Sequence, residues 1–275
     1  MTNRLQKILV TGSSGSIGTS LMEALAKAGY EAVGADKRPN EWNTETDQKT
    51  VRVDLTDRDA VATLLPTDVD LIIHLAAHSR VWDLIENPRL AEENFVMMTN
   101  VVEFARTHGI KKILFASSRE VYGSLIKDAY EEGDASIDAC ESPYAMSKIA
   151  GEAMLRAYQS SLGVNSVILR FANVYGAYDI TNRAIPLFIA HCRTGKPIGI
   201  FGKGKMLDFT HLDDTVAGIM LTLERFDTVK NDVFNIASGV GTDLASLAEK
   251  IQAQMGTAVP ITVEANRTGE VMRYV

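Results

Sequence analysis

Residues 7–18, KILVTGSSGSIG, decide the fold of this chain. An apolar run of strand length, Lys7–Thr11, leads directly into a glycine-rich turn, and an amphipathic stretch of helical period follows. Glycines in such a turn let the backbone approach a pyrophosphate, and the free N–H groups at the helix start attract the phosphates. The segment therefore predicts a dinucleotide-binding strand–turn–helix unit. Its expected cofactor contacts are Gly12, Gly15, Ser16, Ile17 and Gly18, in the spacing G-x-x-G-x-x-G rather than the commoner G-x-G-x-x-G.

Outward from this unit, apolar runs of strand length alternate with helical stretches. The runs are 31–36, 50–55, 70–77 and 111–118, and the helical stretches lie around 57–65, 88–108 and 143–163. Strands that are apolar along their whole length are typical of a parallel sheet with helices on both faces. We therefore predict an α/β fold with a doubly wound parallel sheet. The alternation loosens after 166–176, so we expect a nucleotide-binding domain over 1–175 and a smaller C-terminal substrate lobe over 176–275, interleaved with it.

The composition excludes several classes of protein. The 275 residues include 28 Lys and Arg against 35 Asp and Glu, and the resulting charge of −7 argues against non-specific nucleic-acid binding. No run of about 18 apolar residues predicts a membrane span, and no signal peptide is evident, so we expect a cytoplasmic protein. Cys140 and Cys192 are far apart and are expected to be reduced thiols. No histidine has a partner at metal-ligand spacing, so no metal site is predicted.

Acidic residues after the second and third runs bear on the choice of cofactor. Asp36 ends the second run, where a carboxylate accepts hydrogen bonds from the ribose hydroxyls of NAD and repels the 2′-phosphate of NADP. Lys37 and Arg38 follow directly and would suit that phosphate, so NADP stays open although NAD is favoured. Asp54 ends the third run and is interpreted either as a contact to the adenine edge or as a neighbour of a helix N-cap.

A tyrosine and a lysine open the expected helix 143–163. Tyr144 and Lys148 stand at positions i and i+4, which puts both side chains on one helix face. A phenol titrates near pH 10, roughly three units too high for a base at neutral pH, and a neighbouring ammonium lowers that pKa. Ser117 and Ser118 end the run 111–118 at the edge of the sheet where ligands bind in this architecture. A serine hydroxyl there is placed to align an alcohol for oxidation.

With these motifs in this order, the chain resembles an extended short-chain dehydrogenase/reductase of the NAD-dependent epimerase/dehydratase family (UDP-glucose 4-epimerase-like). The resemblance runs over nearly the whole sequence, through TGSSGSIG, HLAA (74–77), FASSREVYG (115–123), SPYAMSK (142–148), LRFANVYG (169–176) and GKGKMLDFTHLDD (202–214). It implies a Rossmann fold, NAD as the cofactor and a small-molecule substrate, mostly a nucleotide sugar. It also implies a homodimer formed through the helices 88–108 and 143–163.

The resemblance assigns roles to individual residues. Ser118 matches the residue that orients the sugar hydroxyl, Tyr144 matches the base, and Lys148 matches the base's partner. Beyond the glycine turn, the implied cofactor contacts are Asp36, Asp54, Leu55, Leu75, Ala76, Ala77, Asn94, Tyr144 and Lys148. The implied substrate contacts are Ser118, Asn173, Arg267 and Arg273, the last three near phosphates.

Members of this family share a first step, in which the tyrosine takes a hydroxyl proton and a hydride passes to NAD. The resemblance favours an epimerase, in which the keto sugar turns over and takes the hydride back on its other face. Glu120 stands where 4,6-dehydratases and uronate decarboxylases carry a glutamate, so catalysis of either kind is an alternative. The competing interpretation of Glu120 is a structural pair with Arg119 or another cation.

Two further features depart from the family pattern. Leu207 takes the place of an arginine that grips the diphosphate. Unless Arg267 and Arg273 take over that contact, this favours a second alternative, an NAD-dependent sugar dehydrogenase. The sequence stops at Val275, inside a late family motif, and we expect a substrate lobe truncated at the C-terminus. A regulator that senses NAD without turnover is a third alternative, and the intact Ser118, Tyr144 and Lys148 set argues against it.

Overall fold

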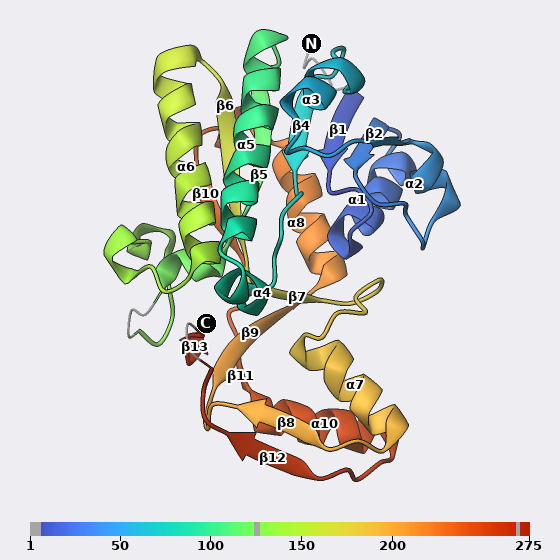
Figure 1. The fold of residues 1–275 in the computed structure, drawn as a ribbon, viewed down its shortest axis with the longest axis vertical. Coiled ribbons are helices and arrows are strands. Elements are labelled where there is room, and N and C mark those ends of the chain that lie inside the picture. Colours follow the sequence, from blue (N-terminus) through green and yellow to red (C-terminus); the bar gives the residue numbers. More distant parts are fainter. Residues whose placement is uncertain (1–6, 124–126, 268–269) are drawn as a thin grey trace.

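The large unit of the protein is a parallel sheet with helices on both faces (Figure 1). The computed structural model describes residues 7–123, 127–267 and 270–275. In these residues the main sheet has seven parallel strands in the order β10-β6-β5-β4-β1-β2-β3. They are β1 (Lys7–Thr11), β2 (Glu31–Asp36), β3 (Thr50–Arg52), β4 (Leu71–His74), β5 (Lys112–Ser118), β6 (Asn165–Phe171) and β10 (Val233–Ile236). The order runs outward from β1 in both directions, so the predicted doubly wound fold is confirmed.

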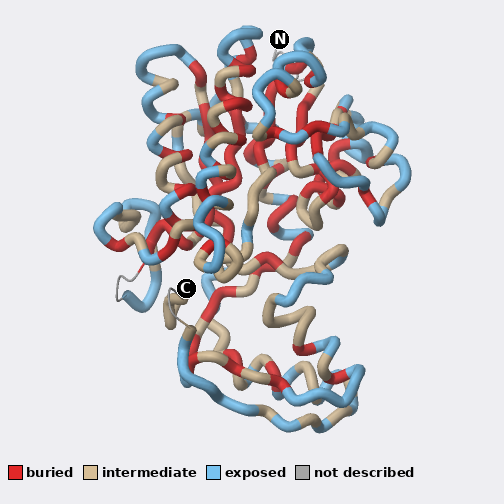
Figure 2. Tube along the Cα trace, in the orientation of Figure 1, coloured by how far each residue is buried: buried red, intermediate tan, exposed pale blue. Residues whose placement is uncertain are grey.

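The sheet is buried on both faces because successive side chains of each strand point to opposite sides. In β1, Leu9 packs with α5 (Arg89–Thr107) and α6 (Pro143–Leu162), whereas Ile8 and Val10 pack with α1 (Ser16–Lys27) and α8 (Leu212–Glu224). All three β1 side chains are fully buried, which explains why the strand reads as a continuous apolar run. Figure 2 shows this burial concentrated in the strands and in the helix faces turned toward them.

Among the helices of the described residues, none combines the length and the apolarity needed to cross a membrane.

The smaller unit lies below the main sheet in Figure 1 and is built from short strands and two helices. Strands β7 (Asn173–Tyr175), β9 (Met206–His211), β11 (Gly241–Asp243) and β13 (Arg273–Tyr274) form one sheet, and β8 (Ile198–Phe201) pairs with β12 (Ile261–Glu264). Helices α7 (Ala184–Thr194) and α10 (Leu244–Met255) pack against them. Between β9 and β11 the chain returns to the main sheet as α8 and β10, so residues after position 175 contribute to both units.

Short elements connect the longer ones, and those that follow β4 and β5 lie at the edge of the sheet where these strands end. They are α2 (Thr44–Gln48), α3 (Arg58–Leu64), α4 (Val81–Glu86), α9 (Phe226–Val229) and the 3₁₀ turns η1 (Arg119–Tyr122), η2 (Glu132–Asp134) and η3 (Ile137–Ala139). The apolar run 166–176 divides at Ala172 into β6 and β7, which join different sheets. The division places β7 and the residues after it at the junction of the two units.

A buried ion pair joins α6 to β6 beneath this edge. Arg170 on β6 donates to Glu152 on α6 through Nε at 2.9 Å and Nη2 at 2.7 Å. Ser117 on β5 donates to the same carboxylate at 2.5 Å, and Arg170 Nη1 donates to the Tyr122 hydroxyl at 3.1 Å. The Arg170 side chain is 1% exposed and that of Glu152 is 7% exposed, so each charge depends on its partner.

Removing one member of this pair should therefore destabilise the protein strongly. We expect Glu152→Ala to lower the free energy of unfolding by about 3–5 kcal/mol, because Arg170 would stay buried without a counter-charge. Urea unfolding followed by circular dichroism measures the change. The matched control is Glu45→Ala, which removes an exposed pair with Lys49 and should have a far smaller effect. Equal midpoints for Glu152→Ala and the wild type would show that the buried pair contributes nothing.

Candidate functional site

The carboxyl ends of β1, β4 and β5 meet at one edge of the main sheet. The turn after β1 holds the glycine motif, the loop after β4 holds Leu75, Ala76 and Ala77, and β5 ends at Ser118. Parallel strands bring their carboxyl ends to the same edge, where ligands bind in doubly wound sheets. Residues from distant parts of the sequence therefore share one site.

The glycine turn is packed so tightly that side chains do not fit at two of its positions. Gly12 has φ +74°, and a Cβ built on it would lie 2.7 Å from the Ala76 nitrogen. A Cβ on Gly18 would lie 2.1 Å from the Gly12 oxygen. The N-cap of α1 is Gly15, which offers no side chain to cap the helix, and the first turn holds no acidic residue. The N–H groups of this turn and the positive end of the helix thus suit a pyrophosphate.

Asp36 ends β2 beside this turn and is itself fixed by the backbone. Its carboxylate accepts from the Ser14 N–H at 3.0 Å and from the Arg38 N–H at 2.9 Å, and the side chain is buried. A carboxylate oxygen offers two lone pairs, so further acceptor capacity remains for ribose hydroxyls. The Lys37 and Arg38 side chains are exposed. The geometry at this strand end suits NAD, as the sequence predicts, because a negative charge at Asp36 opposes a 2′-phosphate.

Other predicted cofactor contacts lie along the same edge. Asn94 on α5 accepts from the His78 N–H at 2.8 Å and donates to the His78 oxygen at 3.0 Å, which ties α5 to the loop after β4. Leu55 is buried, and its oxygen accepts from Asn100 at 2.8 Å. Asp54 is exposed and accepts from the Thr56 N–H at 2.9 Å, and this bond lowers its pKa. The bond to Thr56 closes a turn just before Asp57, the N-cap of α3.

Lys148 and Tyr144 are both buried at the start of α6. Lys148 Nζ donates to the Ala116 oxygen on β5 at 2.7 Å and lies 5.7 Å from the centre of the Tyr144 ring. Burial lowers the pKa of Lys148 to about 8, and burial raises the pKa of Tyr144 to about 12. The positive charges of Arg183 and Arg119 lower the pKa of Tyr144, and so does a hydrogen bond with Ser118. The negative charge of Glu120 raises it. The structure therefore brings Ser118, Tyr144 and Lys148 together.

Glu120 is held from two sides just beyond Ser118. Arg119 lies 3.0 Å from Oε1, and the Tyr274 hydroxyl donates to Oε2 at 3.1 Å. The Arg119 guanidinium also lies 4.3 Å from the centre of the Tyr274 ring, while its Nη1 is buried without a hydrogen-bond partner. The pair with Arg119 is the competing interpretation of Glu120 from the sequence. Tyr274, from β13, was not predicted there, because 154 residues separate it from Glu120.

The predicted substrate contacts in the smaller unit are spread along the junction of the two units. Asn173 donates to the Asp208 oxygen at 2.7 Å. The Arg267 guanidinium lies 3.7 Å from the centre of the Phe201 ring and 5.6 Å from that of Trp82 on α4, so it bridges the units. Arg273 donates to the Asp128 oxygen through Nε at 3.2 Å and Nη2 at 3.1 Å. Each side chain already has a contact within the chain.

Arg183 is a further residue near the site that the sequence analysis did not identify. It is the N-cap of α7, donates to the Ser79 hydroxyl at 2.9 Å, and lowers the pKa of Tyr144 through its charge. Arg183 follows the strand that carries Asn173, and no local pattern marks it. Within the described ranges, no three His, Cys, Asp or Glu side chains gather as metal ligands.

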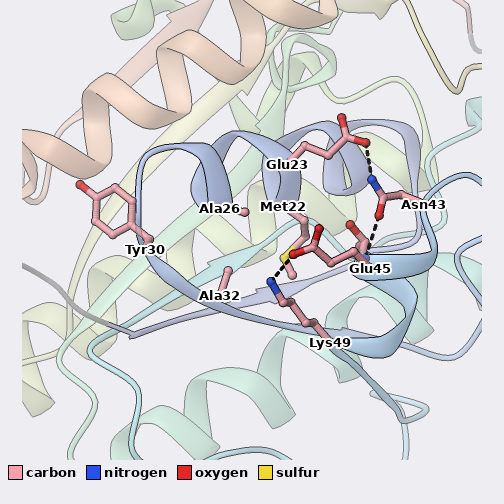
Figure 3. A pocket seen from close by; sticks show the side chains of 9 residues that line it. Met22, Glu23, Ala26, Tyr30, Ala32, Asn43, Glu45 and Lys49 are labelled. Carbon is pink, nitrogen blue, oxygen red and sulfur yellow. Dashed lines mark hydrogen bonds and ion pairs between the residues drawn. The ribbon is translucent and has the colours of Figure 1, made fainter.

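A small pocket lies away from this edge, between α1, β2 and α2 (Figure 3). Its lining includes Met22, Glu23 and Ala26 of α1 and Lys49, which pairs with Glu45 at the exposed end of α2. The residues that line it include none of the predicted site residues. The candidate site is therefore the strand edge and not this pocket.

The buried amine of Lys148 makes a prediction about stability. A folded pKa of about 8 against 10.5 for an unperturbed lysine means that the charged amine destabilises the fold at pH values below 8, and that this cost vanishes as pH rises toward 10.5. Lys148→Met should therefore stabilise the protein at pH 7, by up to about 3 kcal/mol, with a gap that closes above pH 8. Urea unfolding from pH 7 to pH 10 measures this gap.

Lys112→Met is the matched control, since Lys112 begins β5, the strand whose Ala116 oxygen Lys148 contacts, and pairs with Asp227 at the surface. Its gap to the wild type should change little over this pH range. Parallel pH profiles for Lys148→Met and the wild type would contradict the assignment of a depressed pKa to Lys148.

The comparisons with known proteins identify the family of this chain. The model of the NAD dependent epimerase/dehydratase family matches residues 8–237. A putative UDP-glucose 4-epimerase of Methanocaldococcus jannaschii is 32% identical over 274 residues, which cover 97% of this chain and 88% of that protein. Among solved structures, a Thermus thermophilus UDP-glucose 4-epimerase in complex with NAD has a TM-score of 0.88 at 28% identity, covering 98% of this chain and 90% of that one.

A second solved structure shows how widely this fold is shared. The dTDP-glucose 4,6-dehydratase DesIV of Streptomyces venezuelae, with NAD bound, has a TM-score of 0.88 at 26% identity, covering 98% of this chain and 87% of that one. The resemblance found in the sequence is thus confirmed, as is NAD as the cofactor. This chain belongs to the NAD-dependent epimerase/dehydratase family of extended short-chain dehydrogenases/reductases and is an enzyme of that family.

Proposed function

We propose that this protein is a nucleotide-sugar epimerase in which Tyr144 takes the proton of a sugar hydroxyl while the hydride passes to NAD, so that the alcohol is oxidised transiently to a ketone. The observation that carries the proposal is the meeting of Ser118, Tyr144 and Lys148 at the edge that also holds the glycine turn. The similar proteins include UDP-glucose and UDP-glucuronate 4-epimerases, which supports an epimerase and a nucleotide sugar.

The cofactor would lie along the edge from Asp36 to Lys148. The proposed pyrophosphate contacts are the first-turn N–H groups of Ser16, Ile17 and Gly18, and Asp36 would accept from the adenosine ribose. Leu75, Ala76 and Ala77 would face the middle of the dinucleotide, Asn94 would hold their loop, and Asp54 and Leu55 would flank the adenine. When bound, NAD supplies a hydride acceptor that gives the hydride back within the same turnover.

Three side chains of this chain would move or hold the proton. The Ser118 hydroxyl would align the sugar hydroxyl against the Tyr144 oxygen, which takes the proton and later returns it. Lys148, with a pKa of about 8, is mostly protonated at neutral pH, and its positive charge favours the phenolate of Tyr144. Arg183 acts in the same direction, since its charge also lowers the pKa of Tyr144. The positive charges of Lys148 and Arg183 thus partly offset the effect of burial, which raises the pKa of the phenol.

The smaller unit would hold the rest of the substrate. We propose that residues 1–175 mainly bind NAD and that residues 176–275 mainly bind substrate, with α8 and β10 as the part of the second segment that completes the main sheet. Asn173, Arg267 and Arg273 are the proposed contacts to the substrate phosphates. We also propose a cytoplasmic homodimer through α5 and α6, which expose Phe95, Met146 and Leu162 to solvent.

Dehydration or decarboxylation of a nucleotide sugar with the help of Glu120 is the second candidate function. A dehydratase or decarboxylase would use Glu120 as a base or acid, and its place beside Ser118 is the observation that favours this. Both carboxylate oxygens are engaged, however, by Arg119 and by the Tyr274 hydroxyl. A base held in this way is poorly placed to take a proton from carbon, so we favour the epimerase. The sugar dehydrogenase rests on Leu207 alone, which is buried and offers no charge.

Tyr144→Phe tests the proposed base. The variant should lose activity by at least about a hundredfold, because it has no hydroxyl to exchange a proton, yet it should bind NAD nearly as well as the wild type. Proton NMR of the protein with NAD and a panel of nucleotide sugars measures the products. Tyr158→Phe is the matched control, since that hydroxyl bonds Glu103 and links the C-terminal half of α6 to α5. Unchanged turnover by Tyr144→Phe would end the proposed mechanism.

The same NMR experiment separates the candidate functions. A new stereoisomer without accumulated NADH indicates an epimerase. A 4-keto-6-deoxy sugar or a pentose product would indicate the Glu120 chemistry, and stoichiometric NADH would indicate a dehydrogenase.

Glu120→Gln tests whether Glu120 is a base toward carbon. If Glu120 only holds Arg119 and Tyr274, the variant should exchange the C5 hydrogen of the substrate with solvent deuterium no differently from the wild type. Deuterium incorporation followed by NMR measures this exchange. Wild-type exchange that disappears in Glu120→Gln would favour the dehydratase or decarboxylase instead.

A further inference from the structure

Tyr178 reaches from the segment 176–183, between β7 and α7, across to α1. Its hydroxyl donates to Glu23 Oε1 on α1 at 2.9 Å, and its ring centre lies 5.8 Å from that of Trp42. The bond to Glu23 raises the pKa of Tyr178 from its ordinary value, as expected for a phenol that donates to a carboxylate. The side chain thus connects the segment with two parts of the main unit.

The backbone of Tyr178 is held in an unfavourable conformation. Tyr178 has φ +64°, and in the described residues Asn231 is the other non-glycine residue with a positive φ. Asparagine tolerates this region, whereas an aromatic residue there is strained and persists only where its surroundings impose the conformation. Such strain is typical of ligand clamps and other functional segments. The contacts of the Tyr178 side chain are the interactions that offset this backbone strain.

One oxygen of Glu23 joins three segments. It accepts from Tyr178 and also from Asn43 Nδ2, at 2.7 Å. Asn43 in turn caps α2, because its side-chain oxygen accepts from the Thr46 N–H at 2.9 Å. Figure 3 shows Glu23 and Asn43 facing each other between α1 and α2. The carboxylate therefore ties the segment 176–183 to α1 and to the loop after β2.

The two ends of the segment are fixed on opposite sides of the glycine turn. Tyr178 contacts Trp42, which follows β2, and Arg183 donates to Ser79, which follows β4, at 2.9 Å. In the sheet, β1 lies between β2 and β4. A segment fixed on both sides thus runs from the side of β2 to the side of β4, beside the end of β1 that leads into the glycine turn. Figure 1 shows the chain after β7 extending toward α1 and turning back to α7.

We propose that Tyr178 is a positioning residue that holds the segment 176–183 across the glycine turn and thereby slows the release of NAD. The inference rests on the proposed cofactor site but not on the epimerase reaction. Retention suits a reaction whose cofactor ends each turnover in the form in which it began. A segment that is fixed at both ends must detach from Tyr178 or from Arg183 before the dinucleotide leaves.

Release of the cofactor can be measured without any substrate. The full-length protein is loaded with NADH, mixed with excess NAD in a stopped-flow instrument, and the loss of bound NADH fluorescence gives the dissociation rate. Tyr178→Phe removes one hydrogen bond and should speed release by about fivefold. Tyr178→Asn accepts the backbone conformation but lacks the ring and the reach, and should speed release by about tenfold or more. Tyr158→Phe should release NADH at the wild-type rate.

Glu23 supplies an independent arm of the same test. Glu23→Ala should speed release at least as much as Tyr178→Phe does, because it removes the bond to Tyr178 and also the bond to Asn43. Adding Tyr178→Phe to Glu23→Ala should change the rate little, because the Tyr178–Glu23 bond is already absent. Glu23→Gln keeps an acceptor oxygen and should stay close to the wild type. Wild-type release rates in both Tyr178→Phe and Tyr178→Asn would overturn the role of Tyr178 alone. Failure of the wild type to bind NADH would overturn the cofactor site and this inference with it.

Discussion

The site depends on a buried amine, that of Lys148, which the fold keeps in place at a cost in stability. Its Nζ has the Ala116 oxygen as a hydrogen-bond partner, and desolvation lowers its pKa to about 8. Glu152, one helical turn further along α6, raises that pKa again through its charge. The same carboxylate holds Arg170 and accepts from Ser117. The charge on the lysine is thus coupled to the ion pair that packs α6 against β5 and β6, so the framework and the proposed chemistry share one carboxylate.

Close packing is what brings these groups together. Gly151 faces β5, and a Cβ there would lie 2.8 Å from the Phe115 ring, so a side chain would push α6 away from the strand. Lys148 Nζ lies 5.0 Å from the centre of the same ring. Gly12 and Gly18 allow the same close packing in the turn between β1 and α1, where backbone atoms leave no room for a side chain. In both places a missing Cβ sets the distance between a helix and the sheet, and that distance sets where a ligand group can lie.

The parts of the site that the sequence predicts are those encoded by neighbouring residues. The glycine turn, Asp36 at a strand end, and Tyr144 with Lys148 on one helix face all follow from local spacing. The contacts of Glu120 do not, because Tyr274 arrives from β13 after the chain has crossed between the two units. Arg183 likewise depends on the path of the segment after β7. Asp208 matches a family motif, yet only the structure shows its carboxylate accepting from Ser238 and Gly239, an arrangement that fixes a turn beside β11.

The turn from Ser118 to Glu120 is where we expect the reactions of this family to diverge. Ser118 caps η1 by accepting from the Glu120 N–H at 3.2 Å, and the same side chain bonds Tyr144. A change in the orientation of Glu120 would therefore shift the Ser118 hydroxyl, which is proposed to align the substrate. Arg119 and Tyr274 oppose such a change, because together they satisfy both oxygens of the carboxylate. Glu120 raises the pKa of Tyr144, and a counter-charge from Arg119 limits that effect. Pairing Glu120 in this way keeps a carboxylate next to the base without placing a free negative charge there, which suits a reaction that needs one base and no second acid.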